Sequence, residues 1–417
     1  MKLSKIPKLV RSANRYRAQH GLVATYRYAM QRARRRALGQ SDIFNQFSFV
    51  LEKPVGKPYR DGDAAANTVN WFIPAVGRGS GGHLNIFRFV RYLEEQGFDC
   101  RIVITNAPGQ DPAMVEREIA AWFFPLKARV YIGADKAPPA HITFATAWHT
   151  AYDVRNFQST RHKCYFVQDF EPWFFPSGSS STFAEETYRF GFTGVTAGTW
   201  LASVLNRDYG MTTHAIGFSY DRDLYKPLPR RNPELKRVFF YARPNTPRRS
   251  FELGIMVLAD VVRELPGTQV VLAGADLSEF AIPFPYENPG IVDLADLPEL
   301  YCQCDAALVL SFSNLSLLPL ELMACGVPVV SNRAPYTEWL LTDENSRLER
   351  PTVPALAGAI CDLLRHPEQA QRLKAGGFAT CSATDWAVEG RRLGAILSSL
   401  PGTAPASPTT RSDRCPT

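Results

Sequence analysis

Residues 69–97 read VNWFIPAVGRGSGGHLNIFRFVRYLEEQG. The stretch begins with an apolar run (69–76) that is typical of a buried strand. It then passes through a glycine-rich turn and continues with helical periodicity from His83 to a terminal Gly97. A strand that leads through a tight loop into a helix is the first part of a βαβ unit, and such crossovers connect parallel strands. The segment therefore predicts an α/β fold with a parallel sheet.

The same alternation continues along the chain in two runs. In the first run, further strands are expected at 100–105, 130–134, 141–147 and 163–169, with a helix at 111–123. In the second run, strands are expected at 237–244, 268–275, 290–296 and 306–313, with helices from Ser250 and over 297–306. The repetition predicts two Rossmann-like domains that face a central cleft, where the ligand lies beyond the carboxyl ends of the strands.

These patterns predict the following domain organisation. A basic N-terminal helical arm covers 1–45, and an acceptor-side domain covers 46–222. A proline-rich linker (223–233) leads to a donor domain (234–385). The chain ends with a C-terminal helix that crosses back (386–400) and an unstructured tail (401–417). The tail assignment depends on its high content of Pro, Ser and Thr.

Composition indicates an ordinary globular protein. The chain has 417 residues, of which 45% are hydrophobic and 21% charged, and it contains eight cysteines without a disulfide-like spacing. Cys302 and Cys304 could suggest a metal, but no second Cys or His pair stands at zinc spacing, so reduced core cysteines are the preferred interpretation. Neither a membrane-spanning segment nor a secretory signal is recognisable. A cytoplasmic location is therefore predicted.

Residues 1–40 contain eleven Lys or Arg and no acidic residue, whereas the whole chain has a net charge of +7. Three hypotheses compete for this arm: a solvated basic arm, a helix on an anionic membrane surface at the inner face of the cell membrane, and a nucleic-acid-binding segment. Nothing later in the chain resembles a base-reading module, so nucleic acid is not an expected partner.

The glycine loop after the first strand, GRGSGGHLN (77–85), contains Gly77, Gly79, Gly81 and Gly82 before a helix start. Exposed amides at a helix N-terminus bind phosphate, and a plain glycine turn is the alternative. The loop lacks the Gly-Lys-Ser/Thr of a Walker motif and does not fit the dinucleotide fingerprint. NAD binding is therefore not expected.

Three arginines, Arg243, Arg248 and Arg249, crowd the predicted carboxyl end of strand 237–244. The planar guanidinium group matches phosphate oxygens, and such charge-assisted bonds contribute about 1.5–3 kcal/mol each. A solvated basic loop is the alternative, but the position favours a diphosphate site.

Glu321 is the acidic residue of the apolar segment 317–330, LLPLELMACGVPVV. A carboxylate there must be hydrogen-bonded, because its desolvation would otherwise cost several kcal/mol. Asn314, Leu315 and Ser316 are expected in a loop before a helix that opens near Glu321, where the helix dipole favours a negative charge. Glu321 could accept two ribose hydroxyls, or it could serve only as a helix cap.

Three further residues are candidates for the chemical step. His149 follows an apolar strand and could bind a sugar hydroxyl or a phosphate, with a structural histidine as the alternative. Asp169 and Glu171 end the next strand beside Trp173 and Phe174. Carboxylates beside aromatic rings suit a sugar, whose hydroxyls need acceptors and whose apolar faces stack on rings. A solvated, proline-terminated loop is the alternative.

The segment LPLELMACGVPVVSN resembles the nucleotide-sugar signature of the family-4 retaining glycosyltransferases, which have the GT-B fold. The family pattern is a Glu, seven residues and a second Glu, followed by a Met-Ala-x-Gly-x-Pro-Val-Val stretch. Glu321 matches the second Glu, which the resemblance implies to contact the donor ribose. Ser313 stands at the position of the first Glu, so the chain departs from the family beside the donor sugar.

Five blocks in order are similar to the WsaF-type rhamnosyltransferases of this family, and the similarity covers about residues 67–390. The blocks are WFIPAVGRGSGGHLNIFR, FVQDFEPWFFPSGS, AIGFSYDRDLYKP, FFYARPNTPRRSFELG and LYCQCDAALVLSFSNLSLLPLELMACG. The resemblance implies that Gly81 and Gly82 lie near the donor phosphates. It also implies that Arg243 and Arg249 bind the diphosphate, while the choice between Arg248 and Arg249 stays open.

By this resemblance, the expected reaction is transfer of L-rhamnose from dTDP-L-rhamnose to a hydroxyl of a growing cell-surface polysaccharide or glycan, with retention. The acceptor is a saccharide or a lipid-linked glycan, and no cofactor or metal is expected. The alternatives are a glycosyltransferase that uses a UDP- or GDP-linked sugar, a nucleotide-sugar epimerase and a non-catalytic glycan-binding subunit.

Overall fold

The computed structural model describes residues 47–51, 53–107 and 109–404. The chain divides into two compact units, Met1–Lys53 and Pro54–Thr417. In the described part of the first unit, Ser48–Val50 form a short 3-10 helix, η2. The predicted basic arm (1–45) and most of the predicted tail (405–417) lie outside the described residues.

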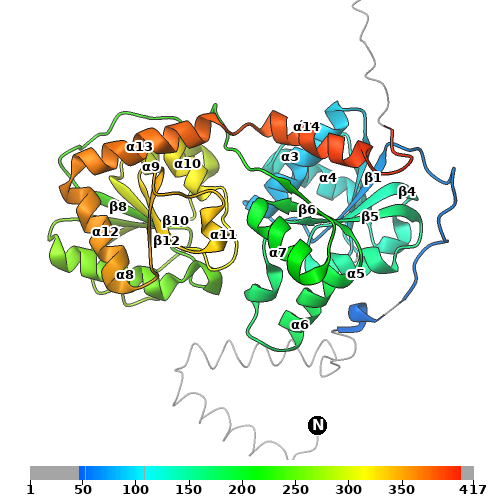
Figure 1. Ribbon diagram of the computed structural model, residues 1–417, viewed down its shortest axis with the longest axis horizontal. Helices are drawn as coiled ribbons and strands as arrows, with labels where there is room; N and C mark the ends of the chain where they lie inside the picture. The colour runs from blue at the N-terminus through cyan, green and yellow to red at the C-terminus, as the bar shows by residue number, and fades with distance from the viewer. Residues whose placement is uncertain (1–46, 52, 108, 405–417) are drawn as a thin grey trace, which may run out of the picture. The chain divides into compact units, whose positions relative to one another are not determined.

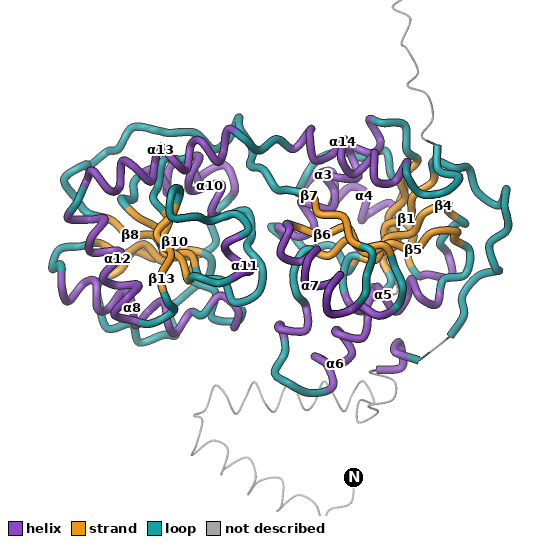
Figure 2. The backbone as a smooth tube through the Cα atoms, in the orientation of Figure 1, coloured by secondary structure: helices purple, strands orange, loops and turns teal. Residues whose placement is uncertain are grey.

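The first sheet of the second unit has seven parallel strands in the order β3-β2-β1-β4-β5-β6-β7. Figure 2 shows its strands in orange, with β1 and β4 to β7 labelled. The strands are β1 (Thr68–Ile73), β2 (Asp99–Ile104), β3 (Arg129–Ile132), β4 (Ala140–Ala145), β5 (Thr160–Val167), β6 (Thr193–Ala197) and β7 (Thr213–Ile216). All residues of β1 and β4 are buried, as expected for central strands covered on both faces. We refer to β1–β7 and their helices as the N-terminal domain.

Helices cover both faces of this sheet (Figure 1). They are α3 (Gly81–Glu95), α4 (Pro112–Trp122), α5 (Trp148–Asn156), α6 (Ser179–Glu186) and α7 (Thr199–Tyr209), with 3-10 turns η3 (Ala134–Lys136), η4 (Glu171–Phe174) and η5 (Thr187–Arg189). The core is rich in aromatic residues: Trp71 stacks on Phe144 with ring centroids 4.4 Å apart, and Phe166 meets the same indole edge-on at 5.7 Å. Such contacts add stability beyond simple area burial.

The second sheet has six parallel strands in the order β10-β9-β8-β11-β12-β13. The strands are β8 (Arg237–Tyr241), β9 (Gln269–Ala273), β10 (Tyr286–Gly290), β11 (Ala306–Val309), β12 (Val329–Asn332) and β13 (Ser346–Glu349). The helices are α8 (Phe251–Glu264), α9 (Leu297–Cys302), α10 (Leu318–Ala324), α11 (Pro335–Glu338), α12 (Val353–Arg365) and α13 (Pro367–Ser382), with turns η6 (Pro247–Arg249) and η7 (Leu294–Asp296). We refer to these elements as the C-terminal domain.

The strand predicted at 290–296 is wrong. The edge strand β10 ends at Gly290, where the predicted strand begins, and Ile291 after it is 83% exposed. Backbone pairing with β9 defines β10, although its sequence, YENPG, has low strand propensity. The apolar residues that suggested a strand belong instead to a surface segment and to η7.

The last helix, α14 (Trp386–Ser398), packs against α3 of the N-terminal domain. Gln96 Nε2 donates to the Gly390 carbonyl at 3.0 Å, and Glu389 accepts from the Gly217 amide at 2.7 Å. The predicted unstructured tail begins too early, because the Pro401 carbonyl accepts from His162 Nε2 at 2.9 Å and the Ala404 amide donates to Ala66.

Both sheets have the doubly wound order, so the predicted α/β class with two Rossmann-like domains is confirmed. In each sheet the first strands are added toward one edge and the later strands toward the other edge. The strand order therefore reverses once, between β1 and β4 in the first sheet and between β8 and β11 in the second. Ligands of open α/β sheets bind beyond the carboxyl ends of the strands at such points. The fold therefore directs attention to the loops after β1, β8 and β11.

Candidate functional site

The loop after β1 leads into α3, whose N-terminus carries the predicted glycines. Ser80 is the N-cap residue: its Oγ accepts from the His83 amide at 3.4 Å and lies 2.8 Å from His83 Nδ1. Gly81 and Gly82 are the first two residues of the helix. A Cβ atom on Gly81 would meet nothing within 4 Å, so this helix end is open to a ligand. Its free amides and the helix dipole suit an anion.

The three arginines lie beyond the carboxyl end of β8, as predicted. Arg243 donates to the Tyr241 hydroxyl at 3.1 Å. Arg249 donates to Ser311 Oγ at 2.8 Å and to the Asn314 carbonyl at 3.3 Å, and burial lowers the pKa of its guanidinium. Arg248 stacks on the Phe174 ring, 3.9 Å from the centroid. Of the three side chains, Arg249 is thus the one seen to bind the loop that follows β11.

Asn314 in that loop connects the two domains and is fully buried. Its Nδ2 donates to the carbonyls of Gln168 at 3.0 Å and Ala197 at 2.9 Å, both in the N-terminal domain. Its Oδ1 accepts from Trp339 Nε1 at 2.8 Å, and its backbone amide donates to Asp169 Oδ1 at 2.8 Å. Every hydrogen-bonding group of this residue is therefore used to join segments far apart in sequence.

Asp169 lies at the end of β5 and faces the arginines. Its Oδ2 is 3.3 Å from Arg248 Nε, and Oδ1 also accepts from the Phe170 amide at 2.9 Å. Burial raises the pKa of Asp169, while the charges of Arg249 and Arg248 lower it. Ser313 is fully buried beside this carboxylate and also lowers its pKa, although its Oγ has no well-aligned hydrogen bond to any described residue.

Glu171 belongs to the N-terminal domain's own framework. Its Oε2 accepts from the Trp148 amide at 2.9 Å at the start of α5, and its Oε1 accepts from the Tyr165 hydroxyl at 2.8 Å. Burial raises its pKa to about 7. Because both oxygens are occupied by protein donors, a structural role accounts for Glu171, and its predicted catalytic role stays a prediction that this geometry does not favour.

His149 is the second residue of α5 and is half-buried. Burial lowers its pKa, so the ring is neutral at pH 7, and its Nε2 has no hydrogen-bond partner among the described residues. A neutral imidazole with a free nitrogen can bind a hydroxyl or accept a proton. The Nε2 atom is itself buried, so a ligand reaches His149 only after neighbouring groups move.

Glu321 lies in the first turn of α10, as predicted. Burial raises its pKa to about 7, and the Tyr225 hydroxyl and the charge of Arg88 lower it. A small cavity lined by residues that include Tyr241, Arg249 and Ser316, but not by Glu321, has a volume of about 10 Å³. That volume holds about one water molecule, so a nucleotide requires the 311–316 loop or the domains to move. Leu315 is buried in the core and offers only an apolar surface.

Gln168, Trp339 and Asn85 were not predicted as site residues. Gln168 Nε2 donates to the Gly82 carbonyl at 3.2 Å, and its Oε1 accepts from Asn85 Nδ2 at 3.1 Å. The position of Gln168 beside Asp169 was the one available signal. The sequence around Trp339 contains no such signal, because its partner Asn314 stands 25 residues away.

Over the described residues, no three His, Cys, Asp or Glu side chains gather as metal ligands would, and the seven cysteines there, including Cys302 and Cys304, are buried free thiols. The expected lack of a metal requirement stays a prediction. The same part of the chain contains no helix with the length and hydrophobicity needed to cross a membrane.

Comparison with known proteins links this geometry to a family. Residues 236–361 match the family model described as "WsaF, C-terminal domain". The chain is 35% identical over 335 residues to the O-antigen biosynthesis protein RfbC of Myxococcus xanthus. The aligned residues make up 77% of this chain and 26% of that protein. The chain thus spans about a quarter of the length of this relative.

Among solved structures, the sucrose-phosphate synthase of Thermosynechococcus elongatus superposes with a TM-score of 0.63 at 16% identity, covering 79% of this chain and 98% of that one. HepE of Anabaena, in complex with UDP and glucose, gives a TM-score of 0.62 at 16% identity, covering 80% and 100%. These likenesses confirm the predicted GT-B fold, and the sequence matches confirm the predicted resemblance to WsaF-type proteins.

Proposed function

We propose that this WsaF-like chain with a GT-B fold is a glycosyltransferase that moves a sugar from a nucleotide sugar to a hydroxyl of a growing cell-surface polysaccharide. One observation carries the proposal: a chain of hydrogen bonds joins the open N-terminus of α3 to Arg249, which follows β8. Gln168 donates to the Gly82 carbonyl (3.2 Å), Asn314 donates to Gln168 (3.0 Å), and Arg249 donates to Asn314 (3.3 Å). Cations and helix amides gathered at one place suit a diphosphate.

In this proposal the protein acts mainly by charge stabilisation. Arg243, Arg249 and the α3 amides hold the diphosphate and stabilise the negative charge that develops as the sugar leaves. Arg248, held by Asp169 and Phe174, is available to the same oxygens after the loop moves. Glu321 accepts the ribose hydroxyls, and Ser316 borders a small cavity together with Arg249. No step requires a metal.

For the chemical step, we propose attack by the acceptor hydroxyl on the same face from which the diphosphate departs, with retention. The bond from the anomeric carbon to the phosphate oxygen breaks as the bond to the acceptor oxygen forms. The departing phosphate takes the acceptor proton. His149, neutral and with Nε2 free among the described residues, orients a hydroxyl of the donor sugar or acceptor, and Asp169 is the carboxylate nearest the arginines.

The donor we propose is dTDP-L-rhamnose, on the basis of the WsaF-type resemblance and the match of residues 236–361. A UDP-linked donor is the alternative, because HepE of similar fold is described with UDP-glucose. The acceptor we propose is a saccharide or lipid-linked glycan, which agrees with the O-antigen role in the name of the relative. We further propose that the basic residues 1–40 bring the protein to an anionic membrane surface, which sedimentation with anionic vesicles tests.

Calorimetric titration of the full chain with dTDP-L-rhamnose, dTDP, UDP-glucose and GDP-mannose tests the proposal, with Glu321→Ala as the control variant. Selective binding of the dTDP compounds that is lost in the variant supports both donor and ribose site. Preference for UDP or GDP compounds refutes the rhamnose donor and leaves the enzyme class. Absence of binding, or binding without transfer to any hydroxyl, favours a glycan-binding subunit, whereas turnover without an acceptor favours an epimerase.

A further inference from the structure

Trp173 is a large aromatic side chain that stays 48% exposed although other rings surround it. Its ring centroid lies 4.8 Å from that of Phe170, 5.8 Å from Trp200 and 5.9 Å from Tyr336. Phe170 is only 5% exposed, so it anchors the group in the core. The indole is therefore held in a fixed orientation while one part of it faces solvent. We name Trp173, Trp200 and Tyr336 the aromatic platform.

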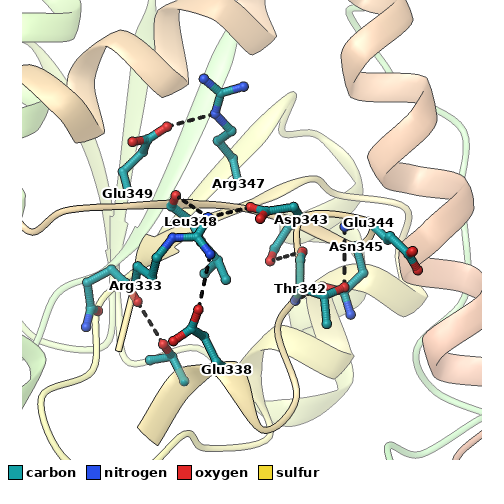
Figure 3. A network of polar contacts seen from close by, with 12 residues as sticks. Arg333, Glu338, Thr342, Asp343, Glu344, Asn345, Arg347, Leu348 and Glu349 are labelled. Atoms are coloured by element: carbon teal, nitrogen blue, oxygen red, sulfur yellow. Dashed lines mark hydrogen bonds and ion pairs between the residues drawn. The ribbon is translucent and has the colours of Figure 1, made fainter. Parts of the chain in front are cut away.

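Tyr336 contributes from the other domain, on the short helix α11. The Trp200 and Tyr336 centroids are 5.6 Å apart. Figure 3 shows the network that fixes this helix: Arg333 donates to Glu338 at 3.1 Å, to Asp343 at 2.6 Å and to the Leu348 carbonyl at 3.1 Å. Inside the domain, Thr337 of the same helix also donates to the buried Asn332 carbonyl at 2.8 Å. These contacts position the Tyr336 ring before any ligand arrives, which reduces the entropy lost on binding.

Charged groups border the platform. Phe174 follows Trp173 directly, and the Arg248 guanidinium lies 3.9 Å from the centroid of its ring. Arg248 is in turn paired with Asp169 at 3.3 Å. A pyranose has an apolar C–H face and a rim of hydroxyls, so it needs an exposed ring and nearby donors and acceptors. The aromatic platform supplies the exposed ring, and the Arg248–Asp169 pair supplies the hydrogen-bonding groups.

We infer that the aromatic platform binds a sugar ring of the saccharide acceptor and so places it beside the arginines that hold the donor diphosphate. The acceptor assignment rests on the proposed function, whereas saccharide binding by the platform does not. The bound class is a pyranose stacked on Trp173, with hydroxyls directed to Arg248 and Asp169. A purely apolar ligand, such as a lipid chain, would have no use for that charged pair.

Saturation-transfer NMR on the full chain tests this, with methyl α-L-rhamnopyranoside and methyl α-D-glucopyranoside as probes and cyclohexanol as an apolar comparison. We expect saturation of the C–H protons of one ring face in the wild type. Trp173→Ala and Tyr336→Ala should weaken binding by roughly three- to tenfold, since an aromatic contact contributes about 0.5–1.5 kcal/mol. Trp173→Phe should retain most of the affinity. Met114→Ala, which removes a side chain that is 52% exposed on α4, is the matched control and should change nothing.

Donor titration of the same variants separates this inference from the proposed function. Trp173-dependent saccharide binding together with donor binding supports both. Trp173-dependent saccharide binding without donor binding by the wild type refutes the glycosyltransferase and leaves the platform. Three results overturn the platform: no saturation of either glycoside, equal binding by wild type and Trp173→Ala, or cyclohexanol binding as strongly as the glycosides.

Discussion

Replacement of Asn314 by alanine should destabilise the protein more than any other loss of a single amide side chain in this site. The side chain makes three hydrogen bonds, to the Gln168 and Ala197 carbonyls and from Trp339 Nε1, at 2.8–3.0 Å. The backbone bonds to Asp169 and from Arg249 remain in the variant, because they use the main chain of residue 314.

The expected size follows from those three bonds. A neutral hydrogen bond contributes about 1 kcal/mol net, and a buried partner left unsatisfied costs about 1–3 kcal/mol. Asn314 is fully buried, so water does not replace the lost bonds unless the domains separate. We therefore expect the free energy of unfolding to fall by about 3 kcal/mol.

Urea unfolding followed by tryptophan fluorescence measures this change. Asn85→Ala is the matched control, since Asn85 is also a buried asparagine but has one hydrogen bond, from Nδ2 to Gln168 Oε1 at 3.1 Å. Its loss should cost about 1 kcal/mol. If Asn314→Ala costs no more than Asn85→Ala, the idea that Asn314 fastens the two domains together is refuted.

Three other changes probe the charges of the site. Arg243→Met should weaken donor binding by roughly 10- to 100-fold in calorimetry, because one charge-assisted phosphate bond is lost. The melting temperature should stay unchanged, since among the described residues the Arg243 side chain contacts only the hydroxyl and ring of Tyr241. Glu171→Gln should reduce a pH dependence. The folded pKa of Glu171, about 7, exceeds the ordinary value of 4.5, so this residue contributes up to about 3 kcal/mol of stability that is lost as pH rises from 4.5 to 7. Urea titrations of the variant should show a shallower loss than the wild type, with Glu321 and Asp153 still contributing; equal slopes would contradict this. Ser313→Glu should abolish transfer and lower the melting temperature, whereas Ser313→Ala should leave the melting temperature unchanged; a stable, active Ser313→Glu variant would contradict this.

The sequence predicted the fold well because apolar strands and amphipathic helices are local patterns. The edge strand β10 was missed because its residues, Tyr286–Gly290, form a strand only by pairing with β9. Among site residues, the arginines and glycines were found because strand ends before helices are recognisable in the sequence. The partnership of Asn314 with Trp339, and the meeting of Trp173 with Tyr336, join separate segments and have no local pattern.

Glu171 shows a different limit. A carboxylate among aromatic residues suits a sugar site, but it also suits a structural role in which it accepts hydrogen bonds from buried groups. Only the donors that surround the carboxylate in the folded protein distinguish the two roles. Here the Trp148 amide and the Tyr165 hydroxyl occupy both oxygens. The oxygens of Asp169 are also occupied, by the Phe170 and Asn314 amides and by Arg248, but two of these three partners belong to the C-terminal domain, so Asp169 joins the domains whereas Glu171 caps its own.

The serine at position 313 follows from the presence of Asp169. Ser313 is fully buried next to that carboxylate, whose pKa burial already raises. A glutamate at 313 would place a second carboxylate there, and two buried like charges raise each other's pKa and oppose folding. The space beside Asp169 is already occupied: Arg248 pairs with this carboxylate, and Arg249 donates to Ser311 and to the Asn314 carbonyl, so a second acid at 313 would have to displace these contacts. In this chain, therefore, the acid beside Arg248 and Arg249 comes from the N-terminal domain, and we expect position 313 on the C-terminal loop to require a small, uncharged residue.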